Sequence, residues 1–370
     1  MIYLDNAATT PILPEAREAF LEYLETFGNP SSMHSFGYKA KCEIEKHRER
    51  IANLMMCGSN EIYFTSCGTE SNNLAILGCL KAFRDKDKIL TSTAEHPSVL
   101  ETVKNSGFSF EFINVKNGIV DLNHLESLID DKTSLVSIMH VNNETGSINP
   151  INEIYNLIKG KSNSILHVDK VQGYGKINEK INADLISFSS HKIGGFKGIG
   201  GLYVKKGTKI NPIMFGGGQE SSLRSGTENL PLIASFSKVS EIAFNMINCN
   251  FSKVKELNLL TRKELKQIKN TIFNNDEFCS PYILNCRFDD CLGETLLHCL
   301  ERREIYIGIG SACSSKATKP SETLKAMGLT SKQIKESIRI SFSPQNTIEE
   351  VKMACEAIKE EVGIIRGIKK

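Results

Sequence analysis

Lys192 is the residue whose setting points most directly to chemistry. It ends the run Ser189-Ser190-His191-Lys192, which follows a short apolar segment and precedes the pairs Gly194-Gly195 and Gly200-Gly201. A lysine among glycines is usually a solvated loop charge. A lysine amine with a lowered pKa can instead attack a carbonyl and form a Schiff base. The residues alone allow both an ordinary loop lysine and a lysine that binds a cofactor covalently.

Pyridoxal phosphate (PLP) is a cofactor that such a lysine can hold. It also needs a carboxylate for its pyridinium nitrogen and a cradle for its phosphate. Asp169 ends another apolar segment. Thr69 stands where a helix is predicted to begin, and a hydroxyl with free backbone N–H groups suits an anion there, although a simple helix cap is the commoner reason for such a threonine. With Ser189 and His191 beside Lys192, these residues meet all three requirements.

Further polar clusters follow other apolar segments. They are Glu95-His96-Pro97, Asn142-Asn143-Glu144-Thr145-Gly146, and Gln172 just beyond Asp169. Each cluster alone would pass for a helix cap or an ordinary turn. Ligands of an open parallel sheet bind outside the carboxyl ends of its strands, so a convergence of such clusters at strand ends favours a binding site.

Cys313 is the cysteine least suited to structural packing. It lies in the stretch 308–321, which is too poor in large apolar side chains to bury well. We expect an exposed, mobile loop, where a thiol near Lys316 and Lys319 ionises more readily than a buried one and can act as a nucleophile. A loop cysteine without any role fits the sequence equally well.

Two other interpretations of these clusters have less support. His167 and Asp169 share one face of a predicted strand, but they have no nearby histidine or cysteine at metal-ligand spacing, so we expect no metal site. The glycine groups at 194–201 and 216–218 do not form a Gly-x-Gly-x-x-Gly turn between an early strand and its helix. That pattern gives a nicotinamide cofactor little support.

Between residues 60 and 205, short apolar segments alternate with amphipathic ones, as strands alternate with helices. Near-continuous apolar segments such as 135–139 indicate an α/β fold with a mostly parallel sheet covered by helices on both faces. The predicted strands are 61–65, 88–93, 108–115, 134–141, 164–169, 184–189 and 201–204, and the helices between them include 70–80, 97–105 and 151–159.

The pattern changes after about residue 250. A charged amphipathic helix and short strands are predicted there, at 253–273, 282–285, 305–307 and 337–341. We predict a large domain at 15–250. A smaller α+β domain is expected to combine residues 1–14 with 251–370 and to carry the Cys313 loop.

The composition favours small-molecule chemistry in a reducing compartment. The 370 residues include 45 Lys+Arg against 43 Asp+Glu, which leaves no basic surplus for nucleic acid or an anionic membrane. No apolar run reaches the ~18 residues of a membrane span, and residues 1–6 lack a signal-peptide pattern. The 11 cysteines are odd in number and form no Cys-x-x-Cys pair, which favours free thiols. We therefore expect a cytoplasmic protein that binds neither nucleic acid nor membranes directly.

Several of these clusters belong to a longer series of ordered motifs. They are Tyr3-Leu4-Asp5-Asn6-Ala7-Ala8-Thr9-Thr10, Gly28-Asn29-Pro30-Ser31-Ser32, Thr69-Glu70-Ser71-Asn72-Asn73, Glu95-His96, Asn142-Asn143-Glu144-Thr145-Gly146, His167-Val168-Asp169, Ser190-His191-Lys192, Arg224-Ser225-Gly226-Thr227 and Gly310-Ser311-Ala312-Cys313-Ser314-Ser315. From residue 3 to about 345, this series resembles the cysteine desulfurases of the NifS/IscS type.

The resemblance implies a PLP-dependent transferase of fold type I, with a mostly parallel sheet sandwiched by helices. It also implies a homodimer whose cofactor sites lie at the subunit boundary. In such an enzyme Lys192 binds PLP covalently and Asp169 pairs with the pyridinium nitrogen. His96 stacks on the ring and carries protons, and Gln172 contacts the ring hydroxyl.

The same resemblance assigns two further groups of residues. Asn143 lies against the cofactor and, with Arg339, binds the substrate carboxylate, and Cys313 is the nucleophile that becomes a persulfide. The cofactor phosphate is held by Gly68, Thr69, Ser189 and His191, with Thr227 reaching over from the partner chain.

The implied reaction converts L-cysteine to L-alanine. Lys192 removes the Cα proton and the Cys313 thiolate takes the sulfur, which then passes to an acceptor. The sequence leaves open whether that acceptor is an iron–sulfur scaffold or a tRNA-thiolation protein. A selenocysteine lyase or another PLP lyase or aminotransferase would keep Lys192 and Asp169 without needing Cys313. A noncatalytic sulfur carrier or binding protein could also be built on this fold.

Two positions depart from the family's usual pattern. Cys67 stands before Gly68 where glycine is usual, and it places a second thiol near the cofactor. Lys170 replaces the usual small residue after Asp169. Strand alternation is expected to point the Lys170 side chain away from Asp169.

Overall fold

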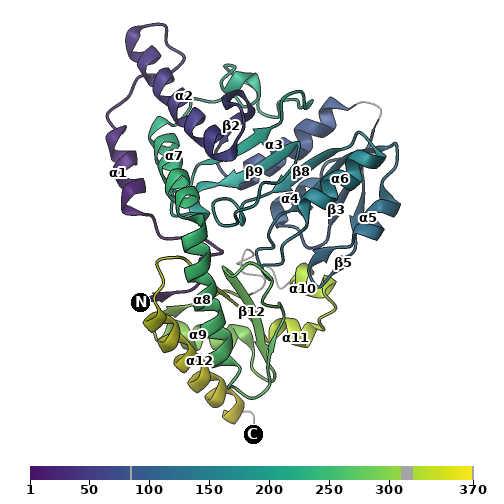
Figure 1. Ribbon diagram of the computed structural model, residues 1–370, viewed down its shortest axis with the longest axis vertical. Coiled ribbons are helices and arrows are strands. Elements are labelled where there is room, and N and C mark those ends of the chain that lie inside the picture. The colour runs from purple at the N-terminus through teal and green to yellow at the C-terminus, as the bar shows by residue number, and fades with distance from the viewer. Residues whose placement is uncertain (84–85, 310–319, 369–370) are drawn as a thin grey trace.

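The computed structural model describes residues 1–83, 86–309 and 320–368 (Figure 1). Within them, a seven-stranded sheet lies above a smaller three-stranded one. The large sheet has the spatial order β2 (Ile62–Thr65), β10 (Gly200–Val204), β9 (Leu185–Ser189), β8 (Ile165–Asp169), β7 (Thr133–Met139), β3 (Lys88–Ser92) and β4 (Ser109–Ile113). In this sheet only β10 runs antiparallel to its neighbours, so the predicted mostly parallel arrangement is confirmed.

Helices cover both faces of the large sheet, because its central strands, such as β7 and β8, are buried on both sides. One face is covered by α3 (Gly68–Ala82) and α4 (Pro97–Lys104). The other face is covered by α1 (Pro14–Glu22), α2 (Ser35–Met55), α5 (Leu122–Leu128), α6 (Ile151–Lys161) and α7 (Leu230–Asn245). The 3₁₀ turns of this region are η1 (Ser59–Glu61), η2 (Ser190–Lys192) and η3 (Glu220–Ser222).

Strand alternation decides which side chains reach which face. In β7, Leu135 packs toward α3 and α4, whereas Val136 and Ile138 pack toward α5 and α6. In β8, Ile165 packs on the α3 side. Since side chains alternate with a period of two, Asp169 reaches that same side four residues later.

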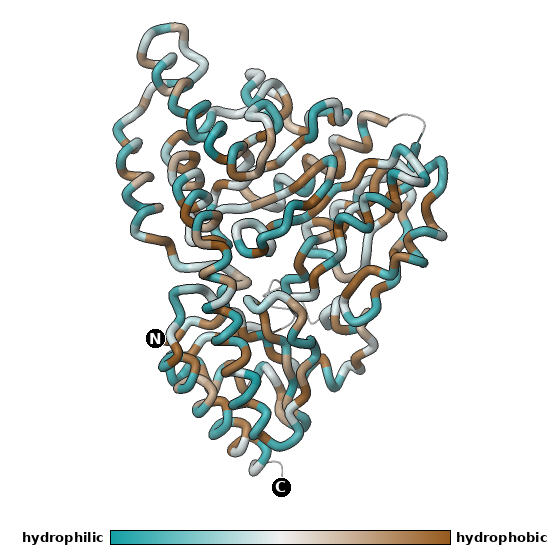
Figure 2. The backbone as a smooth tube through the Cα atoms, viewed as in Figure 1, coloured by the Kyte–Doolittle hydropathy of each residue, from teal (hydrophilic) through white to brown (hydrophobic). Residues whose placement is uncertain are grey.

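The residues after α7 build a second core with the N-terminus. Its antiparallel sheet has the order β11 (Thr271–Phe273), β12 (Ile283–Phe288) and β14 (Ser337–Ser341), and β1 (Ile2–Tyr3) pairs in parallel with β13 (Ile305–Tyr306). The helices here are α8 (Ile247–Leu265), α9 (Gly293–Glu301), α10 (Glu322–Ala326), α11 (Ser331–Lys335) and α12 (Ile348–Ile368). Brown apolar stretches alternate with teal polar ones along this lower part in Figure 2, and its buried apolar residues form a core of their own. The division into residues 15–250 and 1–14 with 251–370 stays a prediction, and this separate core supports it.

The predicted helix at 253–273 is wrong at its C-terminal end. Helix α8 ends at Leu265, and Thr271–Phe273 forms β11 instead. The chain turns at Asn270, whose φ of 57° is left-handed, and β11 then pairs with β12. The apolar residue Ile272 fits the helical period of the preceding segment, which is why the pattern extended the helix too far.

A short hairpin was not predicted although the sequence contains its signal. Strands β5 (Val115–Lys116) and β6 (Ile119–Val120) are joined by Asn117 and Gly118, which both have positive φ. Asn-Gly favours the tight turn that matches the twist of paired strands. The predicted strand at 108–115 therefore ends earlier, with β4 at Ile113.

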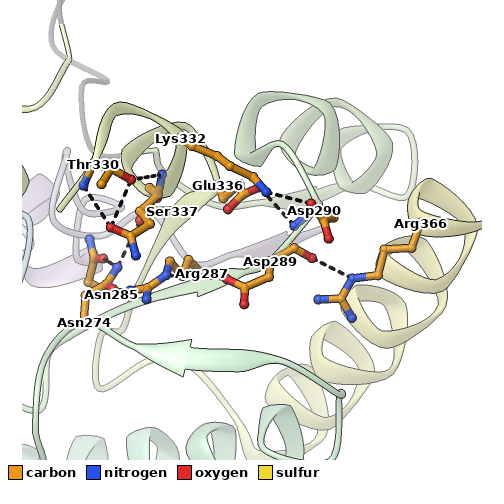
Figure 3. Close-up of polar contacts among 11 residues, drawn as sticks. Asn274, Asn285, Arg287, Asp289, Asp290, Thr330, Lys332, Glu336, Ser337 and Arg366 are labelled. Atoms are coloured by element: carbon orange, nitrogen blue, oxygen red, sulfur yellow. Dashed lines mark hydrogen bonds and ion pairs between the residues drawn. The ribbon is translucent and has the colours of Figure 1, made fainter. Parts of the chain in front are cut away.

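Polar side chains fasten the smaller sheet and link it to the large one. Within the smaller sheet, Asn274 Nδ2 donates to Asn285 Oδ1 over 2.7 Å (Figure 3). Asn285 Nδ2 donates to the Glu144 carbonyl over 3.1 Å, and Asn275 Nδ2 donates to the Thr145 carbonyl over 2.7 Å. These amides fix the loop that follows β7 against the smaller sheet. Among the described residues, no helix is both long and apolar enough to cross a membrane.

A buried ion pair should contribute strongly to stability. Glu220 accepts two hydrogen bonds from Arg48, each 2.7 Å long, and one from the Phe64 backbone N–H at 2.8 Å. We predict that Glu220→Gln lowers the free energy of unfolding by about 3 kcal/mol, because the buried Arg48 guanidinium then keeps only the exposed Glu45 carboxylate as a counter-charge. Urea unfolding followed by circular dichroism measures the loss.

The control variants for this prediction differ in burial and charge. Lys46→Gln removes an exposed partner of Glu43 and should leave the unfolding midpoint unchanged. The double variant Arg48→Met/Glu220→Gln should recover part of the lost stability, because neither position then holds a buried charge and Glu45 is exposed to solvent. Equal stability of Glu220→Gln and the wild type would show that the pair contributes nothing.

Candidate active site

The carboxyl end of the large sheet gathers the predicted clusters. Strands β9, β8, β7 and β3 are neighbours in that order. The residues at or just after their ends are Lys192, Asp169, Asn143 and His96, so they share one edge of the sheet. Thr69 joins them from the start of α3, which follows β2. The predicted convergence of strand-end residues is therefore present in the structure.

Lys192 lies in η2, directly after β9, under the N-terminal segment of the chain. Its Nζ donates to the carbonyls of Ala7 and Ala8 over 2.6 and 2.7 Å. Thr10 holds the same turn, because its backbone N–H and its Oγ1 both donate to the His191 carbonyl over 3.0 Å. The lysine amine is thus fixed by neutral carbonyls from residues far away in the sequence.

Asp169 is held at the end of β8 by donors on two sides. Asn72 Nδ2 donates to Asp169 Oδ2 over 2.8 Å, and the Val171 backbone N–H donates to Oδ1 over 3.0 Å. The residue is only 5 % exposed. The two donors fix the orientation of its carboxyl group at the edge of the sheet, where it can face a ring nitrogen.

His96 caps the N-terminus of α4, where Pro97 occupies the first helical position. Its Nδ1 lies 2.7 Å from Ser98 Oγ and accepts from the Ser98 backbone N–H over 3.1 Å. Burial lowers the pKa of His96, and the Lys192 charge lowers it further against the opposing effect of Asp169. The imidazole is neutral at pH 7, with Nδ1 committed to the cap and Nε2 left for chemistry.

The N-terminus of α3 and the end of β9 form a cradle that fits a phosphate. Ser189 Oγ is buried and has no hydrogen-bond partner among the described residues. A Cβ on Gly68 would come within 2.9 Å of Val171 Cγ2 and 3.7 Å of Ser189 Cβ, so only glycine leaves the backbone open here. Together with the Thr69 hydroxyl and the free N–H groups of the first helical turn, these residues suit an anion. The residues present therefore fit a PLP phosphate.

His191 borders this cradle in its neutral form. Its Nδ1 lies 3.2 Å from Thr9 Oγ1. Burial, followed by the charges of Lys192 and Lys197, lowers the pKa of His191 to about 3. A neutral imidazole can donate one hydrogen bond to an anion. It adds no positive charge that the nearby lysines would repel.

Arg339 reaches the same edge from β14. Its Nη2 pairs with Asp5 Oδ1 over 2.7 Å, and its Nη1 donates to the Asn143 carbonyl over 2.9 Å. Its buried Nε has no partner among the described residues. The structure thus brings Arg339 and Asn143 together, as a carboxylate-binding pair requires. Gln172 lies nearby and donates from Nε2 to the Ala7 carbonyl over 2.8 Å.

Two predicted site residues are not brought to this edge within the described residues. Thr227 is exposed, and it lines a shallow surface pocket with Phe27 and Asn29. Its contact with the cofactor site of a partner chain stays a prediction. Cys313 falls in 310–319, outside the described residues.

Asn72 is a contact residue that was not among the predicted site residues. It donates to Ser98 Oγ as well as to Asp169, both over 2.8 Å, so it connects the His96 cap to the Asp169 carboxylate. Its spacing of three residues from Thr69 places both on one helix face, and this signal was available in the sequence. The carbonyl contact of Ala7 had no such signal, because it is made by the backbone.

The two departures from the family pattern have different surroundings. Cys67 is the N-cap residue of α3, and its backbone carbonyl, not its thiol, accepts from the Ser71 hydroxyl. Lys170 Nζ donates to the Glu179 carbonyl over 3.2 Å, on the far side from the Asp169 partners. In the part of the chain that the structure describes, no group of histidine, cysteine and acidic residues could hold a metal ion.

Most of the chain matches a known family. Residues 2–353 match the class-V aminotransferase family. The chain belongs to that family. It is 39% identical to a protein named cysteine desulfurase IscS 1 from Archaeoglobus fulgidus, over all of this chain and 98% of the relative. It is 40% identical to a cysteine desulfurase IscS from Methanosarcina thermophila, over 99% of this chain and 93% of the relative.

Solved structures agree with this class-V assignment. A NifS-like protein superposes with a TM-score of 0.92 at 36% identity, over 98% of this chain and 99% of the other. A structure described as SspA in complex with cysteine has a TM-score of 0.82 at 31% identity, over 94% of this chain and all of the other. The predicted resemblance to the NifS/IscS type and the predicted PLP fold type I are therefore confirmed.

Glu95, which directly precedes His96, should make the stability of the protein depend on pH. Its Oε1 accepts from Ser92 Oγ over 2.6 Å, and burial raises the pKa of its carboxyl from 4.5 to about 8. Between these values the folded protein keeps a proton that the unfolded chain has released, so stability falls as pH rises. We predict that the free energy of unfolding of Glu95→Gln rises relative to that of the wild type as the pH increases from 5 to 8. The difference should grow by up to about 1.4 kcal/mol per pH unit.

Urea unfolding at several pH values measures this difference. Glu49→Gln, at an exposed position, is the matched control and should follow the wild type at every pH. Parallel stability curves for Glu95→Gln and the wild type would contradict a neutral Glu95.

Proposed function

We propose that this protein is a PLP-dependent cysteine desulfurase, which converts L-cysteine to L-alanine and passes the sulfur through an enzyme persulfide to an acceptor. The observation that carries the proposal is the joint placement of Lys192 and Asp169 beside the cradle at the start of α3. The names of the relatives, and a neighbour's structure with cysteine, support the substrate. The acceptors we propose serve iron–sulfur cluster assembly or tRNA thiolation.

Different residues of the site would bind different parts of PLP. Gly68, Thr69, Ser189 and His191 would hold the PLP phosphate. Asp169 would pair with the ring nitrogen and His96 would stack on the ring, while Gln172 would contact its hydroxyl. When bound, PLP supplies an electron sink that makes the substrate Cα proton acidic.

The remaining steps belong to side chains of this chain. Arg339 and Asn143 would bind the substrate carboxylate, and the Lys192 amine would take the Cα proton at Nζ. The Cys313 thiolate would attack the substrate sulfur, so that an S–S bond forms as the Cβ–S bond breaks. The electron pair of the broken bond goes to the substrate carbon, which takes up protons and leaves as alanine. The enzyme keeps the sulfur as a persulfide on Cys313.

The described residues on either side of 310–319 support this role of Cys313. The Gly308 backbone N–H donates to the Arg339 carbonyl over 2.9 Å. Ser321 Oγ donates to Glu144 Oε2 over 2.5 Å, next to Asn143. Both flanks of the segment that contains Cys313 are thus fastened beside the groups proposed to bind the substrate.

A homodimer is part of the proposal. Large apolar side chains are exposed along α1, α2 and the segment between them, including Leu24, Phe27, Met33 and Tyr38. This surface adjoins Thr227, which lines a pocket with Phe27. A second copy would cover the apolar side chains and would receive Thr227 at its phosphate cradle.

A reducing, cytoplasmic location also belongs to the proposal. The ten cysteines in the described residues form no disulfide with one another. Free thiols are the ordinary state of cysteine in the cytosol, where a persulfide can also be passed on by thiol exchange.

The decisive test follows alanine and sulfide from L-cysteine with a reducing thiol present. We predict that Cys313→Ala keeps the visible absorbance of bound PLP but loses at least about 100-fold in sulfide release, because the nucleophile is missing. Lys192→Ala should yield no borohydride-stable adduct at position 192. Cys249→Ala, which removes an exposed thiol, is the control and should keep wild-type turnover.

The outcomes separate the proposed function from its alternatives. Undiminished turnover of Cys313→Ala would remove Cys313 from the mechanism and favour a lyase that needs no enzyme thiol. Bound PLP without any alanine from L-cysteine would favour a noncatalytic carrier. A wild-type protein that takes up no PLP would overturn the proposal.

A further inference from the structure

Lys176 is a buried lysine that the proposed mechanism does not use. It lies in the turn after β8 and is only 6 % exposed. The turn is fixed by Tyr174, whose ring stacks on Phe188 at 4.6 Å, and by Gly175, whose φ of 65° is left-handed. A Cβ on Gly175 would come within 2.8 Å of Ala243 Cβ. The backbone thus turns Lys176 inward, toward the site.

The Lys176 ammonium has weak partners for a buried charge. Its Nζ donates to Gln172 Oε1 over 3.5 Å and lies 5.4 Å from the centre of the Tyr282 ring. It forms no ion pair with a carboxylate in the described part of the chain. Lys176 and Lys192 line the same cavity, of about 190 Å³. Burial, followed by the charge of Lys192, lowers the pKa of Lys176 to about 7.

Hydrogen bonds connect Lys176 to the cofactor lysine. Gln172 accepts from Lys176 at Oε1 and donates from Nε2 to the Ala7 carbonyl. Lys192 donates to the same carbonyl. In its protonated form Lys176 can only donate, so it faces the oxygen of the Gln172 amide and leaves the Nε2 donors on the side of Lys192. Lys176 therefore decides which end of this amide meets the site.

We propose that Lys176 is a positioning residue for the cofactor site, which orients the Gln172 amide and places a positive charge beside Lys192. This inference rests on the proposed function, because it assumes that PLP binds at Lys192 with its ring hydroxyl at Gln172. The charge would favour a negative ring oxygen. It would also disfavour a proton on the nitrogen of Lys192.

The other ionisable groups around Lys176 come from each element packed against it. Lys192 and His191 belong to η2, Tyr282 precedes β12, and Glu15 of α1 lines the same cavity at an exposed position. His191 is neutral, because burial and the neighbouring lysines disfavour its charged form. Among these groups, only Lys192 would be bonded to the cofactor and report its protonation through visible absorbance.

The test is a pH titration of the visible absorbance of the PLP-loaded protein without substrate. We predict that Lys176→Met and Lys176→Gln both raise the midpoint of this titration by up to about one pH unit, because both remove the positive charge that Lys176 carries below its pKa of about 7. Lys176→Gln keeps a donor for Gln172 Oε1. It should therefore bind PLP more tightly than Lys176→Met, as equilibrium titration with the cofactor measures.

Lys170→Met is the matched control. Lys170 is also a lysine whose pKa burial lowers, to about 8, but it bonds to Glu179 on the other side of the strand. Its substitution should leave the absorbance midpoint at the wild-type value. Thermal unfolding of all variants shows whether they fold. If Lys176→Met does not fold, Lys176→Gln still provides the absorbance midpoint.

The results distinguish this inference from the function on which it rests. Loaded Lys176 variants with the wild-type midpoint would overturn the inference, while cofactor bound to the wild type would leave the proposed function intact. An equal shift in Lys170→Met would also overturn it, since any buried lysine would then have the same effect. Failure of the wild type to take up PLP would overturn both.

Discussion

The fold and the site depend on one strip of backbone, residues 5–10, which lies between the two sheets. Asp5 pairs with Arg339, and Asn6 Nδ2 donates to the Ser341 carbonyl over 2.9 Å, so the strip is fastened to the smaller sheet. Its next carbonyl, that of Ala7, accepts from both Gln172 and Lys192. Because a single peptide segment contacts both halves, it fixes the distance between the arginine and the lysine. Two halves that moved independently would need extra energy to bring these groups together.

Several ionisable groups near the site are buried with too few ion-pair or hydrogen-bond partners to offset their loss of water. The strip partly covers Lys192, and Tyr282, which directly precedes β12, covers Lys176, so water is excluded from the Lys176 amine. Desolvation then lowers the pKa of Lys176 and His191 and raises that of Glu95. Each of these shifts reduces stability over some pH range. Such a loss of stability is typical of binding and catalytic sites, where ionisable groups are held in fixed positions and protonation states.

The sequence predicts the edge of the large sheet well, for a physical reason. Apolar strands followed by polar residues repeat along the chain, and parallel strands place those residues side by side. The order of these segments is therefore enough to group Lys192, Asp169 and His96. It is not enough to give the antiparallel direction of β10, which depends on how the chain crosses the sheet and leaves no local pattern.

Contacts made by distant segments are the part that sequence patterns miss. Asn72 lies within a recognised motif, and helical spacing from Thr69 could have pointed it at Asp169. Lys176 has no comparable signal, because its burial results from Tyr282, about a hundred residues later, and from the N-terminal strip. Local periodicity also failed at Thr271–Phe273, where pairing with β12 decided the structure. A residue's chemistry follows from its type and spacing, whereas its protonation state follows from which distant segments exclude water from it.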